Sequence, residues 1–151
     1  MKIDQELLNI RVMRKDDIEA VVDIDAKVFG AERMDYYERK ISMILDRKGS
    51  IATSLVADYN NQVIGFVMGN IFTGEFGIPQ KTASLDTIGI DPDFSGQGLG
   101  TQLLDEFENH LRKAGVENIQ TLVDRGNIPL SKFFNKSGFA PSQTINLEKS
   151  I

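Results

Sequence analysis

The stretch GIDPDFSGQGLGTQLL, residues 89–104, decides the fold, because crowded glycines join an apolar, strand-like segment to a helical pattern there. Gly96, Gly98 and Gly100 stand at every second position of that junction. Since glycine carries no side chain, a backbone with three of them can come close to another molecule. N–H groups at the start of a helix favour an anion, most often a phosphate or pyrophosphate. The alternative is a tight turn in which the glycines serve only helix–strand packing, and the glycine pattern alone leaves both open.

The spacing of these glycines excludes two common phosphate loops. The glycines follow G-x-G-x-G instead of the G-x-G-x-x-G of dinucleotide-binding folds. No Gly-Lys-Ser/Thr follows them, as it would in a Walker loop. The pattern therefore favours a pyrophosphate ligand outside these two classes.

Around this stretch, the hydrophobic periodicity predicts an α/β sandwich with a mixed sheet flanked by helices. Asn60 and Asn61 separate two strand-like runs and indicate a hairpin, because asparagine tolerates positive φ. In the strand before the glycines, Leu85 stands at an odd position, whereas Ile88 and Ile90 stand at even positions. This change of phase, in a strand that contains Gly89, predicts a β-bulge. The elements expected are strands at 9–14, 83–90, 118–124 and 144–148, the hairpin at 51–72, and helices at 16–30, 35–49, 99–115 and 127–139.

The composition limits the class of protein. With 151 residues and 41% apolar content, the chain is expected to form a single domain, residues 1–151. The sequence has no cysteine and one histidine, which excludes disulfides, thiolate sites and histidine-rich metal sites, so no metal is expected. A net charge of −5 argues against a nucleic-acid partner. No apolar run is long enough to cross a membrane and no signal peptide is visible, so we expect a cytoplasmic protein without a membrane partner.

Two stretches together resemble a known family. IGIDPDFSGQGLGTQLL, residues 88–104, closely resembles the acyl-coenzyme A signature of the GNAT superfamily of N-acetyltransferases, Arg/Gln-x-x-Gly-x-Gly/Ala. NIPLSKFFNKSGF, residues 127–139, resembles the second motif of that superfamily, Asn-x-x-(Ala)-x-x-x-Tyr/Phe-x-x-x-Gly-Phe. The resemblance implies a GNAT-like, mostly antiparallel sheet. It also implies an N-acetyltransferase that moves an acetyl group from acetyl-CoA, its co-substrate, to a primary amine.

The resemblance further implies which residues contact acetyl-CoA. The strand backbone before the glycines would contact the pantetheine arm, and the glycine loop would surround the pyrophosphate. The residues concerned are Ile88, Gly89, Ile90, Ser95, Gly96, Gln97, Gly98, Leu99, Gly100, Thr101, Asn127 and Phe134. Ser95 stands where the family prefers Arg or Gln, so somewhat weaker affinity is expected. Phe134 stands where many members have the tyrosine that protonates the departing thiolate.

The chemistry implied is direct attack of an amine on the thioester carbonyl, through a tetrahedral oxyanion. The backbone N–H of Ile90 is the candidate oxyanion donor. Because a lysine-type amine has a pKa near ~10.4, it needs a base. Asp86 is the candidate base, directly or through a water, with Glu75 as a second candidate, although Asp86 also fits an ordinary solvated position. Phe134 cannot donate a proton, but a thiol with a pKa of roughly 8.5 is a tolerable leaving group without it.

Three functions remain open at this point. Besides the enzyme, the sequence fits a non-catalytic acyl-CoA-binding module, in which Ser95 and Phe134 reflect lost chemistry, and an interaction domain without a thioester ligand. His110 lies at the edge of an apolar helix face, and we expect it outside the site. The acceptor amine is not identified, although the acidic net charge favours cationic amines by steering. The resemblance also suggests a homodimer through the last strands.

Overall fold

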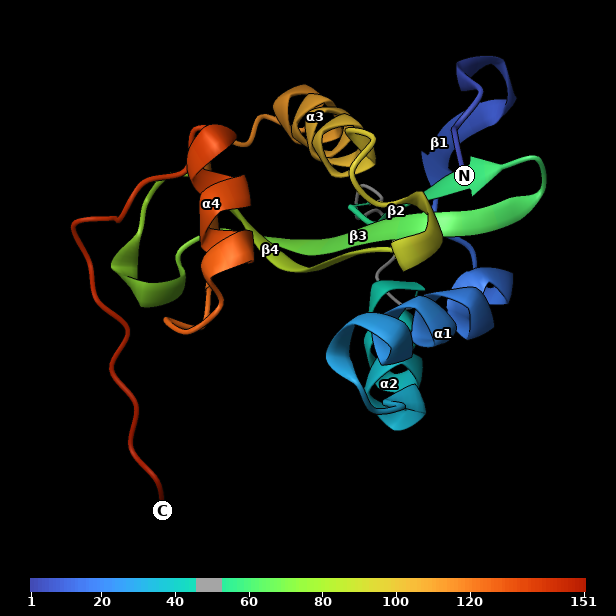
Figure 1. The fold of residues 1–151 in the computed structure, drawn as a ribbon. Coiled ribbons are helices and arrows are strands. Elements are labelled where there is room, and N and C mark those ends of the chain that lie inside the picture. Colours follow the sequence, from blue (N-terminus) through green and yellow to red (C-terminus); the bar gives the residue numbers. More distant parts are fainter. Residues whose placement is uncertain (46–52) are drawn as a thin grey trace. The chain divides into compact units, whose positions relative to one another are not determined.

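The structure of the chain is a computed structural model that describes residues 1–45 and 53–151 (Figure 1). The chain falls into two compact units, Met1–Thr121 and Leu122–Ile151. The first unit contains the sheet and its helices, and the second contains one short helix, α4 (Ile128–Lys136), and the C-terminal residues. The single domain expected over residues 1–151 stays a prediction.

The sheet keeps its strands in the order of the chain. They are β1 (Leu8–Val12), β2 (Leu55–Tyr59), β3 (Gln62–Phe72), β4 (Thr82–Ile90) and β5 (Asn118–Thr121). Strands β1 to β4 are antiparallel neighbours, and β5 runs parallel to β4. The turn between β2 and β3 is the expected hairpin, since Asn60 and Asn61 adopt positive φ values of 49° and 67°. The prediction of a mixed, mostly antiparallel sheet is confirmed.

Helices cover both faces of this sheet (Figure 1). Helices α1 (Ile18–Phe29) and α2 (Met34–Leu45) lie on one face, and α3 (Leu99–Lys113) lies on the other. Apolar residues at helical spacing make α3 amphipathic, and its buried residues are Leu99, Leu103, Leu104, Phe107 and Leu111. The core on the opposite face contains Met13, Val21, Val22, Ile24, Tyr37, Ile41, Val56, Phe66 and Met68.

The C-terminal part differs from the prediction. Strand β5 ends at Thr121, and residues 144–148 form no strand in this structure, so that expectation was wrong. A strand needs a neighbour to pair its backbone groups, and in the part of the chain that the structure describes no strand pairs with this segment. Its apolar side chains, Ile145 and Leu147, are 82% and 83% exposed. The strand through which a homodimer was expected is therefore absent here, and the predicted helix end at Gly49 lies outside the described residues.

Candidate functional site

Strand β4 contains a β-bulge at Asp86. Two adjacent residues of β3, Met68 and Gly69, pair with Thr87 and Leu85 of β4, respectively. Asp86 is therefore an extra residue that the register leaves without a partner on β3. The bulge predicted in this strand is confirmed.

Two glycines account for the local packing of this bulge. A Cβ atom on Gly69 would lie 2.5 Å from the carbonyl oxygen of Ser84, so only glycine allows the two strands to approach here. A Cβ atom on Gly89 would lie 2.6 Å from Cε1 of Phe66, so Gly89 lets β4 pack over that ring. The extra residue, Asp86, lies between Leu85 and Ile88, where the apolar residues change phase, whereas Gly89 serves ring packing.

Strands β4 and β5 separate just where the bulge begins. They pair only over residues Thr82–Leu85 and Asn118–Thr121, and the Thr121 hydroxyl donates a hydrogen bond of 2.8 Å to the carbonyl oxygen of Leu85. Beyond this bond, residues 87–90 pair with β3 on one side, and no strand among those the structure describes pairs with them on the other. This open backbone edge can accept an extended ligand as if it were a further strand.

The bulge also decides which N–H groups point to the open edge. The N–H of Asp91 donates to the carbonyl oxygen of Ile64 on β3, at 2.9 Å. Because successive N–H groups of an extended strand point to opposite sides, those of Ile90 and Ile88 point away from β3. The carbonyl of Leu85 also points away from β3, toward Thr121. Before the extra residue, the odd-numbered residues direct their backbone N–H and carbonyl groups away from β3, and after it the even-numbered residues do. The N–H groups of Ile88 and Ile90 thereby become available to a ligand.

The glycine loop presents a row of unpaired backbone donors. Gly96 and Gly98 adopt left-handed φ values of 76° and 81°, which glycine adopts more readily than any other residue. Gly98 is the N-cap of α3, and no side chain caps this helix. Among the described residues, none accepts a hydrogen bond from the backbone N–H groups of residues 96–101. Six adjacent donors at the positive end of a helix are an arrangement that can bind a phosphate or pyrophosphate.

A buried carboxylate fixes the start of this loop. Asp91 is only 4% exposed, and its carboxylate accepts the N–H of Asp93 at 3.0 Å and the Lys27 ammonium at 3.1 Å. The hydrogen bond to Asp91 raises the pKa of Lys27. Beyond this point the chain turns through a short 3-10 helix, Pro92–Phe94, into the glycines. Asp91 thus fixes the backbone between the last residue of β4 and the first N–H group of the glycine loop.

The carboxylate of Asp86 is engaged through both oxygens. The Lys40 ammonium lies 2.5 Å from Oδ2, and the Ser84 hydroxyl donates to Oδ1 at 2.6 Å. Lys40 comes from α2, and its ammonium also lies 5.9 Å from the centre of the Tyr36 ring. The side chains of Lys40 and Asp86 are 20% and 23% exposed, so the pair is partly shielded from water. The candidate base is therefore held by a lysine that the sequence did not single out.

The sequence model of the acetyltransferase (GNAT) family matches residues 18–139 of the chain. The chain belongs to this family. The match runs from the first residue of α1 to the end of the second motif, and it covers the bulged strand and the glycine loop.

Solved structures share this fold at low sequence identity. A transcriptional regulator from Bacillus halodurans C-125 gives a TM-score of 0.78 at 19% identity, over 95% of this chain and 99% of that one. The aminoglycoside N-acetyltransferase AAC(6')-Iy, in complex with CoA, also gives 0.78 at 19% identity, over 95% and 94%. A ribosomal-protein-alanine N-acetyltransferase from Brucella melitensis biovar Abortus 2308 gives 0.73 at 15% identity, over 95% and 99%. At these identities the likeness shows the GNAT fold.

Two side chains of the GNAT loop make contacts that were not foreseen. The Ser95 hydroxyl donates to the carbonyl oxygen of Pro92 at 2.9 Å, so its proton is already used within the loop. The side chain of Gln97 accepts the N–H of Ile3 at 2.7 Å and donates to the carbonyl oxygen of Met1. Gln97 thereby ties the N-terminal segment to the glycine loop, while its own backbone N–H stays open.

The second GNAT motif lies in the unit Leu122–Ile151. The Asn127 side chain caps α4, since its Oδ1 accepts the N–H of Leu130 at 3.2 Å. The Phe134 ring packs between Phe133 and Phe139, with ring centres 5.3 Å and 5.0 Å away. Both side chains therefore make structural contacts within this unit. Their contacts with acetyl-CoA stay a prediction.

Behind the bulge, a buried polar cluster connects α1, α2 and β4. The Tyr37 hydroxyl donates to Asp25 at 2.8 Å and lies 3.5 Å from the Thr87 hydroxyl. Arg33 donates to both oxygens of Asp25, at 2.8 Å and 2.6 Å. Burial, together with the bond to Asp25, raises the pKa of Tyr37 well above its ordinary value, and the hydrogen bond with Asp25 raises that of Arg33. Tyr37 therefore stays protonated and serves as a packing residue.

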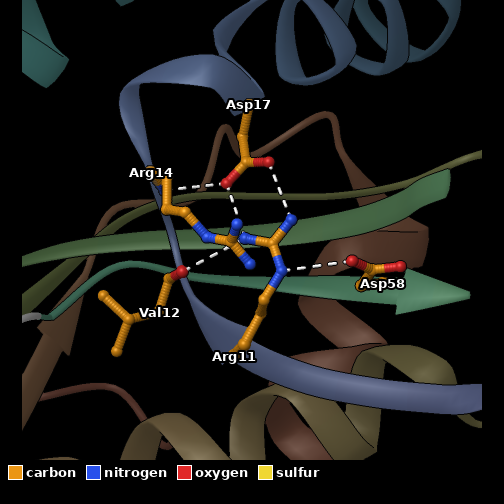
Figure 2. Close-up of polar contacts among 5 residues, drawn as sticks. All are labelled: Arg11, Val12, Arg14, Asp17 and Asp58. Carbon is orange, nitrogen blue, oxygen red and sulfur yellow. Dashed lines mark hydrogen bonds and ion pairs between the residues drawn. The ribbon is translucent and has the colours of Figure 1, made fainter. Parts of the chain in front are cut away.

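A second ion-pair cluster braces the start of α1 (Figure 2). Arg11 donates to both oxygens of Asp17, at 2.8 Å and 2.9 Å, and to Asp58 at 3.1 Å. The backbone N–H of Arg14 donates to the same Asp17 carboxylate at 2.7 Å. Burial alone would raise the pKa of Asp17, but the hydrogen bonds from Arg11 and Arg14 outweigh it and lower that pKa. This cluster joins β1, β2 and Asp17, the residue directly before α1.

The remaining candidates lie on other elements of the chain. Glu75 sits in an exposed 3-10 helix, Glu75–Gly77, and His110 lies half-buried on α3. Within residues 1–45 and 53–151, no group of three or more acidic or histidine side chains could hold a metal ion. None of the helices in these ranges is both long and apolar enough to cross a membrane.

Proposed function

We propose that this GNAT protein is an acetyl-CoA-dependent N-acetyltransferase that moves the acetyl group to a primary amine by direct attack. The observation that carries the proposal is the row of six unpaired N–H groups at residues 96–101, which continues from the open edge of β4. The six N–H groups suit a pyrophosphate, and the open edge of β4 suits the amide groups of an extended pantetheine arm. We take residues 1–151 as one domain, because the family match runs across both units.

Different parts of the chain would contact different parts of acetyl-CoA. The backbone at 96–101 would hold the pyrophosphate, and the edge at Ile88–Ile90 would hold the arm. Asn127 and Phe134 of the second motif would also contact acetyl-CoA. The N–H of Ile90, which points away from β3, would stabilise the oxyanion that forms on the thioester carbonyl. Such donors act from fixed positions and so lower the barrier without reorganisation.

Asp86 is the base in this proposal, and it must exchange partners to act. Its carboxylate is paired with Lys40, so an incoming amine has to displace that ammonium before its own proton can be taken. A cationic acceptor would bring its own positive charge to the carboxylate, which agrees with the net charge of −5. Because Phe134 stands where many family members have a tyrosine, the reaction lacks the contribution of that general acid, which is typically ~10²–10⁴-fold in rate. Water would then protonate the thiolate.

The fold neighbours illustrate the range of acceptors. One is an aminoglycoside N-acetyltransferase and another a ribosomal-protein-alanine N-acetyltransferase. We propose a cationic amine as the acceptor class for this chain, in a cytoplasmic setting, and leave its identity to an amine screen. The alternative is a non-catalytic acyl-CoA-binding module. The engaged Asp86 carboxylate and Phe134 favour it.

A calorimetric titration with acetyl-CoA tests the binding half, with desulfo-CoA and ATP as controls. Gly98 offers a matched pair of variants, because Asn and Asp have nearly the same shape and both tolerate positive φ. Gly98→Asp places a negative charge among the donors and should weaken acetyl-CoA binding by roughly 100-fold, whereas Gly98→Asn should weaken it by roughly tenfold or less. Equal losses in both variants would refute an anion site at this loop.

Release of free thiol with added amines tests the catalytic half. The enzyme should release thiol in proportion to acetylated amine, and Asp86→Asn should lower that rate or shift its pH profile. Tight binding without thiol release, across the amine screen, would favour the non-catalytic module. Absence of binding at millimolar acetyl-CoA would rule out both functions.

A further inference from the structure

Lys40 is the lysine that the fold brings to the bulge. Its ammonium lies 2.5 Å from Asp86 Oδ2 although the two residues are 46 positions apart in the chain. Its side chain is 20% exposed, whereas the side chain of Lys27, which is also paired with a carboxylate, is 51% exposed. Lys27 pairs with Asp91 at the far end of β4, at 3.1 Å. The two lysines thus have similar partners but stand at opposite ends of the open edge.

The position of Lys40 corresponds to that of an acceptor amine. Asp86 directly precedes the open edge, and the N–H of Ile88 follows two residues later, about 7 Å along an extended strand. A lysine ammonium on four rotatable carbons can cover such a distance by changing rotamers. An amine beside Asp86 and a carbonyl at the N–H groups of Ile88 or Ile90 would then be neighbours on one strand.

Resting on the function proposed above, we propose that Lys40 is a self-acetylation site, whose side-chain amine is the first acceptor of the acetyl group. Asp86 takes a proton from the Lys40 ammonium, and the neutral amine attacks the thioester carbonyl carbon. A C–N bond forms and the C–S bond breaks. CoA leaves as its thiolate and is protonated to the free thiol, while the remaining proton goes to solvent. The products are acetyl-Lys40, CoA and one proton, so no other reactant is needed.

The modification would change the site that produced it. Acetylation removes the positive charge of Lys40 and with it the ion pair to Asp86. Among the described residues, the carboxylate then keeps only the Ser84 hydroxyl as a partner, and it is open to an external cationic amine. Self-acetylation would thereby convert a closed site into one that can accept substrate.

Peptide mass mapping after incubation of the full chain with acetyl-CoA tests the proposal. Acetylation at Lys40 should be roughly tenfold or more faster than at any other lysine, because the amine and the thioester are held together. Its rate per chain should not change when the protein is diluted. Lys40→Arg keeps the ion pair but cannot form this product, so the acetyl group should be lost from the peptide. The control variant Lys113→Arg, at an exposed lysine in the last turn of α3, should leave acetylation at Lys40 unchanged.

Two further variants separate this reaction from ordinary chemical acetylation. Gly98→Asp, which blocks the proposed pyrophosphate site, should reduce acetylation at Lys40 to the rate of exposed lysines, and Asp86→Asn should slow it. Acetyl groups spread evenly over all lysines, equally in wild type and in Gly98→Asp, would overturn the proposal. If acetyl-CoA binds and an external amine is acetylated while Lys40 is not, only this inference fails. If acetyl-CoA does not bind at all, the proposed function fails with it.

Discussion

At the scale of single residues, Gln97 shows how a loop with open donors is kept in shape. Two glycines at positive φ make the loop costly to order, and nothing inside it offers the N–H groups a partner. The Gln97 side chain compensates through its bonds to Ile3 and Met1. We therefore expect Gln97→Ala to raise the dissociation constant of acetyl-CoA roughly three- to tenfold, because the ligand must then order the loop itself. Calorimetry measures this change, and kcat should stay the same.

Gln102→Ala is the matched control for this prediction. Gln102 also contacts the N-terminal segment, donating to Gln5 at 2.8 Å, but it lies within α3, beyond the open donors. This variant should leave the affinity for acetyl-CoA within roughly twofold of wild type. An equal loss of affinity in both variants would mean that the N-terminal segment acts as a whole, without a special role for Gln97.

At the scale of elements, the bulge depends on the absence of a side chain at Gly69. A Cβ there would meet the Ser84 carbonyl oxygen at 2.5 Å and the Phe107 ring at 2.6 Å. We expect Gly69→Ala to destabilise the protein by about 1–3 kcal/mol and to weaken acetyl-CoA binding, because the strands must part where the bulge turns the Ile88 N–H outward. Urea unfolding and calorimetry measure the two effects. Gly65→Ala should cost less, since its Cβ would meet the ends of two flexible side chains at 3.0 and 3.1 Å and a backbone oxygen only at 3.4 Å.

The cluster that joins β1, β2 and α1 predicts a pH dependence of stability. The pKa of Asp17 lies below its ordinary value of 3.8 in the folded chain, so its contribution is complete above that value. The contribution is lost as the pH falls through the lower, folded value. We expect Asp17→Asn to lower the free energy of unfolding by roughly 2–3 kcal/mol at pH 7, because Arg11 loses a buried partner. Urea unfolding at a series of pH values should show this difference shrinking below pH 3.8.

The exposed neighbour of Asp17 supplies the control. Asp16→Asn should change the free energy of unfolding by less than about 0.5 kcal/mol at either pH, as expected for a surface substitution. A difference between wild type and Asp17→Asn that stays constant from pH 7 to acid would contradict the ion-pair account and point to the backbone bond with Arg14 instead.

At the scale of the whole molecule, local sequence patterns predicted the sheet, the helices and the glycine loop. The hairpin followed from Asn60 and Asn61, and the loop from glycines that only need to be adjacent in sequence. The phase change after Leu85 predicted a bulge, but a change of phase marks an interval, so the extra residue was identified only in the structure. The strand at 144–148 was wrong because alternation cannot show whether a partner strand exists.

The candidate site was only partly predictable for a related reason. Lys40 and Asp86 are 46 residues apart, and Tyr37 and Asp25 are 12 apart on two different helices. Neither pair has a spacing that a local motif would reveal, since three-dimensional packing alone brings the partners together. The contacts of Gln97 with residues 1–3 also join segments far apart in the sequence, so no local motif reveals them.

The last expectation concerns the chain as one cooperative unit. A ligand at 100 times its dissociation constant stabilises the folded state by about 2.7 kcal/mol. If residues 1–151 are one domain, desulfo-CoA should slow hydrogen exchange by the same factor in the slowest amides of β4 and of α4, because both exchange only when the whole chain unfolds. If the units Met1–Thr121 and Leu122–Ile151 unfold separately, only the unit that binds the ligand gains protection. Gly98→Asp should abolish the gain in either case, which separates binding from non-specific stabilisation.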